Sequence, residues 1–195
     1  KLSGGLYQPL ATYMPKSETK KQVKDAVVPE ENFQIENLLD SKVWWLNITG
    51  ENYKKVVERG TLFSPNYEGN HWSHKNQTKI KKGDIFLIYS DLAIRSVGIA
   101  KSNNEVIEKE NTADIDFIKS LKTENSNADE YNKLSFYSFE LSLPIQKDDI
   151  ELDERIKENQ RFNKYATFTK KGNAGYHHLS EISDEFLDYV KHRFL

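Results

Sequence analysis

Two adjacent tryptophans, Trp44 and Trp45, constrain the fold of this chain more than any other feature of its sequence. They stand in the run VWWLN, whose β-branched and aromatic residues are typical of a strand. Successive side chains of a strand point to opposite faces of the sheet, so the two rings cannot enter the same core. One ring is expected in the core of the domain. The other requires a second packed layer, a partner molecule or a flat ligand.

The composition excludes several kinds of protein. A chain of 195 residues suits one domain, or one domain with an extension. There is no cysteine, which rules out disulfides and thiolate metal sites. No apolar run approaches the roughly 20 residues of a membrane helix, so no membrane partner is expected. No signal peptide is visible, which favours a cytoplasmic origin, and the first residue, Lys1, suggests a processed or trimmed piece.

The charges are segregated along the chain, although the totals of 28 basic and 30 acidic side chains nearly balance. Residues 41–101 carry a net +5 (10 basic, 5 acidic) and residues 155–195 a net +3 (8 basic, 5 acidic). Residues 102–154 carry a net −9 (5 basic, 14 acidic). If the two basic segments meet in space, they form one positive face with the acidic segment turned away. The alternative is a scatter of solvated charges.

The hydrophobic pattern predicts a mixture of strands and helices. Residues 1–40 lack sustained periodicity and are interpreted as a polar N-terminal extension or linker before a domain over residues 41–195. Strands are predicted at 43–48, 83–90, 95–102 and 133–145, helices at 52–59, 113–121, 152–157 and 180–195, and a long polar loop at 64–83. Gly60 stands where the first helix is expected to end, and Ser180 or Ser183 can cap the last helix. Residues 91–94 are short enough for a hairpin connection, and Pro144 ends the last strand or marks an edge. Because no βα unit repeats, we expect an α+β fold, a small twisted β-barrel with flanking helices, rather than a doubly wound sheet.

No catalytic constellation is recognisable. The chain has neither a Walker-type loop nor a Gly-x-Ser-x-Gly motif. His71 and His74 could share a metal only if their loop turned helically, and the neighbours His177 and His178 diverge in a strand. We therefore expect a binding domain without metal or cofactor rather than an enzyme.

Aromatic residues stand out in polar surroundings instead. Trp72 lies in the polar run NHWSH, Phe63 precedes it, and Tyr89 ends a predicted strand. A tryptophan in a loop can simply cover the open end of a barrel. Aromatic rings beside polar groups also form a stacking platform, and a flipped nucleobase is held in this way.

Two runs, VWWLNITGENYKKVVERGTLFSPN and KKGDIFLIYSDLAIRSVGIAKS, resemble the EVE and YTH branch of the PUA superfamily. Members often open with a Tyr/Trp-Trp-Leu-Asn strand and a helix, and continue with a Gly-Asp-x-hydrophobic-hydrophobic-x-Tyr strand and a Val-Gly-Ile-Ala strand. The tail KKGNAGYHHLSEISDEFLDYV is similar to their closing pattern. The resemblance covers residues 41–195 and implies a PUA-like (EVE/YTH-like) bent barrel whose aromatic pocket accepts one modified base.

The resemblance implies a reader of nucleic acid. YTH members read N6-methyladenine in RNA, whereas EVE-like members often form the DNA-reading end of McrB-type modification-dependent restriction systems, where a base is flipped from the duplex. We therefore expect a module that recognises a methylated base in DNA, with RNA possible, as the specificity domain of a defence system. The effector, a nuclease or an AAA+ motor, would lie in the same chain or complex.

The resemblance carries over to single residues through the motifs. Thr49-Gly-Glu-Asn52 resembles the YTH stretch Ser-Glu-Asp-Asn, whose asparagine faces the base, and Asn47 falls where groups approach the base edge. Phe63 departs from the first YTH cage tryptophan, since phenylalanine is smaller and cannot donate a hydrogen bond. The second cage tryptophan has no counterpart in residues 103–125, and Trp72 is predicted to replace it from another loop.

The predicted site consists of a base pocket and a set of phosphate contacts. The pocket residues are Trp45, Asn47, Asn52, Phe63, Ser64, Trp72 and Tyr89. Phosphates, whose contacts position a protein without reading sequence, are expected to bind Lys75, Lys79, Lys81, Lys82, Arg161, Lys164, Lys170 and Lys171. Trp44 is assigned to the core and Trp45 to the pocket, an assignment that a one-residue slip of the strand would reverse.

Three other functions stay open. A YTH-like RNA reader would prefer single strands and sense the 2′-OH. A nuclease that uses His71, His74 or His177 would show metal-dependent cleavage by this chain alone. A protein-interaction module would expose Trp44, Trp45 and Trp72 as a hydrophobic patch.

Overall fold

The computed structural model describes residues 41–66, 69, 72–109, 112–122, 128–162, 166–175 and 178–194. The predicted extension over residues 1–40 lies outside them. The strands are β1 (Val43–Asn47), β2 (Thr61–Asn66), β3 (Ile85–Ser90), β4 (Ala93–Ala100), β5 (Glu105–Glu108), β6 (Glu130–Gln146) and β7 (Leu179–Glu181). The helices are α1 (Gly50–Arg59), α2 (Trp72–Lys75), α3 (Thr112–Ser120), α4 (Leu152–Phe162) and α5 (Asp184–Phe194), with 3-10 turns η2 (Asn76–Lys79) and η3 (Lys147–Asp149).

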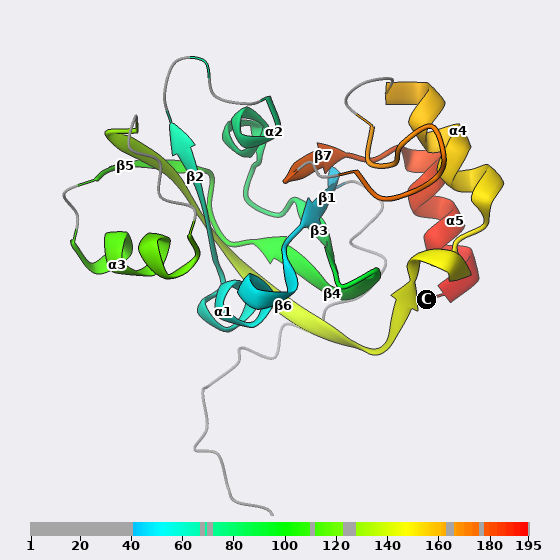
Figure 1. Cartoon of the computed structure of the whole chain (residues 1–195), viewed down its shortest axis with the longest axis horizontal. Helices are drawn as coiled ribbons and strands as arrows, with labels where there is room; N and C mark the ends of the chain where they lie inside the picture. Colours follow the sequence, from blue (N-terminus) through cyan, green and yellow to red (C-terminus); the bar gives the residue numbers. More distant parts are fainter. Residues whose placement is uncertain are drawn as a thin grey trace, which may run out of the picture. The chain divides into compact units, whose positions relative to one another are not determined.

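The strands form one curled sheet in the order β2-β6-β4-β3-β1-β7, with β5 also paired to β6. β1 and β3 are parallel, whereas the other pairs are antiparallel. β6 pairs with β2 through its first residues and with β4 through the rest, and it bends across the molecule between them (Figure 1). The sheet therefore curls into a half-barrel, which confirms the α+β class. Within the described residues β2 and β7 form unpaired edges, so the barrel is not closed.

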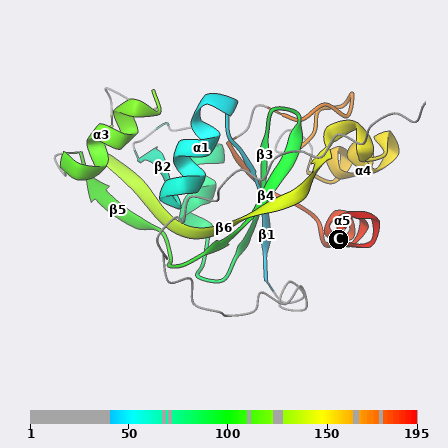
Figure 2. The same cartoon turned by 90° about the horizontal axis from the view of Figure 1, so that it is seen from below.

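The helices flank this sheet in separate groups. α3 lies with β5 at one end of β6, and α4 and α5 lie at the other end (Figure 2). α1 ends at Gly60, which has the left-handed conformation (φ 61°) predicted for it. α5 begins after Ser183, whose Oγ accepts a hydrogen bond from the Phe186 N–H at 2.9 Å, so Ser183 is the cap. No helix in the described part of the chain is both long and apolar enough to cross a membrane.

The paired tryptophans occupy two separate apolar layers. Trp44 is fully buried in the core between the sheet and α1, and its Nε1 donates a hydrogen bond to Asp84 Oδ2 at 3.0 Å. Trp45, 1% exposed, lies on the opposite face of β1. Its ring centroid is 4.8 Å from that of Tyr89 and 5.3 Å from that of Phe168, which packs in turn against α5. A second packed layer therefore accounts for the second tryptophan.

Several elements differ from the pattern-based expectation. The predicted loop over residues 64–83 contains the end of β2, α2 and η2, and β2, β5 and β7 were not predicted as strands. α4 extends to Phe162 rather than to residue 157. Pro144 does not end β6, because pairing with β4 is interrupted over residues 141–144 and resumes at Ile145. A proline without an amide hydrogen is tolerated at such an irregularity.

Candidate functional site

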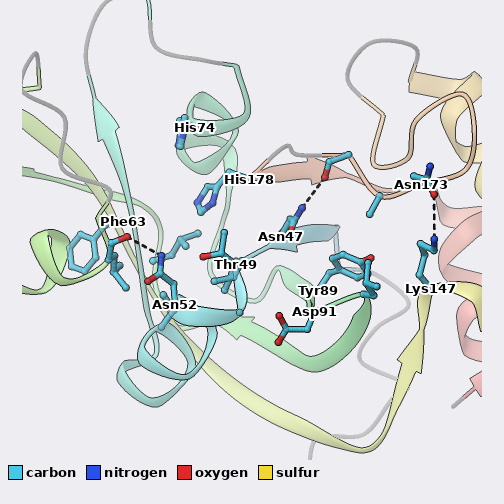
Figure 3. A pocket seen from close by; sticks show the side chains of 18 residues that line it. Asn47, Thr49, Asn52, Phe63, His74, Tyr89, Asp91, Lys147, Asn173 and His178 are labelled. Atoms are coloured by element: carbon cyan, nitrogen blue, oxygen red, sulfur yellow. Dashed lines mark hydrogen bonds between the residues drawn. The ribbon is translucent and has the colours of Figure 1, made fainter.

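A pocket of about 960 Å³ lies where β1 and β3 end (Figure 3). Because these strands are parallel neighbours, their ends lie side by side, and Asn47 stands opposite Tyr89. The start of α1, β2, α2 and the segment before β7 complete the walls. Half of the 18 lining residues have side chains that can donate or accept a hydrogen bond, namely Asn47, Thr49, Asn52, His74, Tyr89, Asp91, Lys147, Asn173 and His178.

The structure brings four of the predicted pocket residues together in this lining: Asn47, Asn52, Phe63 and Tyr89. Ser64 does not line it, since its side chain is buried and its Oγ donates to the His74 carbonyl at 3.4 Å. Trp45 does not line it either, which corrects its assignment, because Tyr89 and Phe168 cover the ring. The side chain of Trp72 lies outside the described structure.

The two pocket asparagines are held in place by the main chain. Asn47 Nδ2 donates to the Gly175 carbonyl at 2.8 Å, and the Asn47 backbone N–H donates to the His178 carbonyl at 2.9 Å. Asn52 Nδ2 donates to the Leu121 carbonyl at 2.9 Å. An amide side chain has two donor hydrogens and two acceptor lone pairs, so both groups keep capacity for a ligand after these bonds. Their orientation is therefore fixed before any ligand binds.

Tyr89 places a buried phenol in the pocket wall. The residue is 4% exposed, and its hydroxyl oxygen has no hydrogen-bond partner among the described residues. Burial raises the pKa of this hydroxyl, and the nearby Asp148 carboxylate raises it further. Tyr89 is therefore a neutral hydrogen-bond donor at physiological pH.

Two histidines stack in the wall opposite Tyr89 (Figure 3). The rings of His74 in α2 and His178 before β7 have centroids 5.2 Å apart. The Nε2 atom of His178 is buried without a partner in the described structure. Burial lowers the pKa of His178 to about 3, and His74 contributes to the lowering. His178 is thus neutral at pH 7, with one ring nitrogen as donor and the other as acceptor.

This histidine pair was not predicted, because 103 residues separate its members in the sequence and only the fold joins them. The sequence signal was limited to isolated histidines considered as metal ligands. Among the described residues, no group of three or more His, Cys, Asp or Glu side chains is arranged to hold a metal ion.

The turn between β3 and β4 forms a further part of the wall. Its two central residues, Asp91 and Leu92, both line the pocket and both have positive φ, 47° and 63°. Asp91 sits against the start of α1, where a Cβ on Gly50 would lie 2.1 Å from Asp91 Oδ1. Glycine is therefore needed at this position for the carboxylate to approach. A hairpin connection was predicted here, but its place in the pocket was not.

Basic residues lie at unequal distances from the pocket. Lys75 is exposed beside His74 on α2, and Lys170 and Lys171 are exposed in the turn that leads to Asn173. Lys79 is exposed in η2, and its Nζ donates to Asn76 Oδ1 at 2.8 Å.

The remaining predicted phosphate contacts are less well placed. Lys81 and Lys82 precede β3 and so lie at the end of that strand far from Tyr89. Arg161 forms an ion pair with Glu185 at 2.9 Å, and Lys164 lies outside the described residues. Lys147, which was not predicted, lines the pocket and donates from Nζ to Asn173 Oδ1 at 3.3 Å.

Comparisons with known proteins leave the family open. No family model and no curated protein matches the chain. Similar solved structures include an ASCH protein from Zymomonas mobilis, at 8% identity and a TM-score of 0.45 over 77% of this chain and 94% of that one. A hypothetical protein from Leishmania major has 13% identity and a TM-score of 0.46 over 78% of this chain and 94% of that one. A protein from Pseudomonas putida has 8% identity and a TM-score of 0.48 over 78% of this chain and 99% of that one. At TM-scores below 0.5, these likenesses carry no conclusion about function.

Proposed function

We propose that this domain binds a modified base of nucleic acid in the pocket at the ends of β1 and β3. The observation that carries the proposal is a pair of buried atoms in lining residues, Tyr89 Oη and His178 Nε2, that have no partner in the described structure. Buried polar atoms are almost always hydrogen-bonded, and each exception requires an explanation. A flat ligand with hydrogen-bonding groups along its edge would supply partners for both atoms once a small turn of the two side chains exposes them to the pocket.

The dimensions and chemistry of the pocket support a nucleotide-sized ligand. Its volume of about 960 Å³ lies at the upper end of the range typical of small-molecule sites. Phe63 and Tyr89 contribute aromatic surface, while Asn47, Asn52 and Asp91 contribute donors and acceptors. An extracted base is commonly read by this combination of rings and polar groups along its Watson–Crick edge.

Duplex DNA with a methylated base is the substrate that we favour. The sequence resemblance to EVE-like domains of the PUA superfamily supports this choice, as does the half-barrel with a pocket at the ends of its strands. Lys75 and the Lys170–Lys171 pair near the pocket are suited to phosphate groups. The domain would then be the specificity module of a modification-dependent restriction system, with the nuclease or AAA+ motor elsewhere in the chain or complex.

The structure has different consequences for the three alternative functions, an RNA reader, a protein-interaction module and a nuclease. A YTH-like RNA reader would use the same pocket, and only a binding comparison separates it from a DNA reader. The protein-interaction alternative loses two of its three exposed tryptophans, because Trp44 and Trp45 are both buried. For the nuclease alternative, His71 and His177 lie outside the described residues.

The proposal is tested by binding at a fixed salt concentration. The probes are duplex DNA that is unmodified, that contains N6-methyladenine or that contains 5-methylcytosine, together with methylated single-stranded RNA. We expect a preference for one modified duplex. Tyr89→Phe, which removes only a hydroxyl without a described partner, should reduce that preference about tenfold, as expected for one lost hydrogen bond.

A matched control is Tyr137→Phe, which removes the same hydroxyl from a partly exposed residue of β6 outside the pocket lining. This variant should bind like the wild type. Preference for the methylated RNA would assign the pocket to an RNA reader. Equal and weak binding of all four probes, or equal effects of the two tyrosine variants, would refute the proposed pocket.

A further inference from the structure

We propose that Leu92 acts as a wedge that enters the base stack when the domain extracts a base from duplex DNA. This inference rests on the proposed function and adds how the base leaves its helix. It starts from the turn between β3 and β4, in which Asp91 and Leu92 both adopt positive φ. Two-residue hairpin turns of this kind strongly favour Asn-Gly or Asp-Gly, because glycine adopts positive φ without steric cost. A leucine at the second position is therefore under backbone strain.

The side chain of Leu92 is unfavourably placed as well. It is 65% exposed, although it is apolar and lines the rim of the pocket. Single exposed leucines are common on protein surfaces, and Leu143 on β6 is more exposed still. Leu143, however, neither lines the pocket nor has positive φ. Leu92 combines strain, exposure and a position beside the pocket, and strained residues in proteins cluster at functional sites.

Hydrogen bonds and an ion pair fix the turn that carries the Leu92 side chain. The Leu92 carbonyl accepts a hydrogen bond from the Lys147 backbone N–H at 2.8 Å, and Arg95 Nε donates to the Ser90 carbonyl at 3.0 Å. Arg95 also forms an ion pair with Asp91 at 3.6 Å. The flanking strands are paired up to Ser90 and Ala93, immediately on either side of the turn. The leucine thus projects from a braced hairpin rather than from a loose loop.

A braced apolar side chain beside a base pocket has a direct use in duplex recognition. Proteins that distort DNA insert apolar side chains between base steps, where the side chains partly unstack the bases. When a base leaves the duplex, the apolar faces of its neighbours are exposed, and an inserted leucine covers them. Because Asp91 and Leu92 both border the pocket, the wedge would enter the helix next to the base that the pocket receives.

The wedge makes a prediction that depends on the state of the base. Leu92 should contribute to binding only when the base must be taken out of a stacked pair, since a base that is already unpaired needs no wedge. The test uses the modified base that the domain prefers, placed in a paired duplex, opposite an abasic site, and in a single strand. A 2-aminopurine next to the modified base reports unstacking by its fluorescence.

Two variants separate the wedge from the fold. Leu92→Gly removes the side chain and suits the positive φ, so the turn is retained. Leu92→Met keeps an apolar side chain of similar volume. We expect Leu92→Gly to weaken binding to the paired duplex at least about tenfold and to abolish the 2-aminopurine signal, with less than about a twofold change for the two unpaired probes. Leu92→Met should remain within about twofold of the wild type with every probe.

Failure of the wedge and failure of the pocket give different results. If the wild type binds the unpaired modified base but Leu92→Gly leaves binding to the paired duplex unchanged, the wedge is refuted and the pocket stands. Equal weakening with all three probes would also refute the wedge, because Leu92 would then be an ordinary contact. If the wild type does not distinguish the modified base in any probe, the pocket itself is refuted.

Discussion

The two neighbouring tryptophans provide a matched pair of substitutions, Trp44→Phe and Trp45→Phe. Both side chains are buried in β1, at 0% and 1% exposure, and each substitution removes the same atoms. They differ in the indole N–H. Trp44 Nε1 donates to Asp84 Oδ2 at 3.0 Å, whereas Trp45 Nε1 has no partner among the described residues. The difference between the two losses of stability therefore contains one buried hydrogen bond to a carboxylate, besides the ring contacts, such as Lys42 Nζ at 4.7 Å from the Trp44 ring centroid.

The expected difference in the free energy of unfolding between the two variants comes mainly from the Trp44–Asp84 hydrogen bond. The loss of the indole ring volume is common to both variants and cancels to first order. A hydrogen bond to a charged group contributes about 1.5–3 kcal/mol, and Asp84 is itself buried, so its carboxylate is not resolvated when the donor is removed. The Lys81 backbone N–H, which also donates to Asp84 Oδ2 at 3.0 Å, compensates in part. We expect Trp44→Phe to lower the free energy of unfolding by about 2 kcal/mol more than Trp45→Phe does.

Urea unfolding followed by far-ultraviolet circular dichroism measures both free energies. The dependence on urea should have the same slope for the two variants, so that the midpoints report stability alone. Equal losses, or a larger loss for Trp45→Phe, would show that the Trp44–Asp84 hydrogen bond does not stabilise the fold as argued.

Three further predictions concern the pocket and its supports. His178, whose pKa falls from 6.5 to about 3 on folding, stabilises the fold fully above pH 6.5 and progressively less as the pH falls toward 3. At pH 5, which is about 1.5 units below the unfolded pKa, the loss should be about 2 kcal/mol. Urea unfolding of His178→Gln should lack this loss, and a variant that loses as much as the wild type would contradict the assignment. Asp114→Asn removes a buried carboxylate that forms ion pairs with Arg59 and with Lys133. The substitution should therefore lower the free energy of unfolding by about 3 kcal/mol. A loss below about 1 kcal/mol would mean that both ion pairs are solvated. Gly50→Ala places a methyl group against the Asp91 carboxylate and forces it out of the pocket wall. The variant should bind the base more weakly, with little change in its thermal midpoint. Unchanged affinity would exclude the Asp91 carboxylate from base recognition.

Elements with strong local signals were predictable from the sequence. The apolar runs of β1 and β3 predicted strands, Gly60 predicted the end of α1, and Ser183 was one of two predicted caps for α5. Each signal lies within a few residues of the feature that it sets. β2 contains Pro65, and β7 has only three residues, so neither has the alternation of an independent strand. Their strand conformation depends on pairing with β6 and β1, which are distant in sequence.

Site residues were predictable where they belong to strands that the local sequence pattern predicts. Asn47 and Tyr89 lie next to the ends of two predicted strands, and parallel pairing brings them together. Lys147 and His178 were not predicted as pocket residues, because each comes from a segment whose position depends on the whole topology. Trp45 was misplaced for a related reason. The alternation of a strand separates two faces but does not reveal that α5 and Phe168 cover the second one.

The most direct test of the pocket is the amide NMR spectrum of the ¹⁵N-labelled domain. The spectrum is recorded with a short duplex that carries the preferred modified base and again with the unmodified duplex, and the two sets of chemical shifts are subtracted. We expect the differences to concentrate at the ends of β1 and β3, in the Asp91–Leu92 turn and at His178. Differences confined to other surfaces, or identical shifts with both duplexes, would contradict recognition of the base in this pocket.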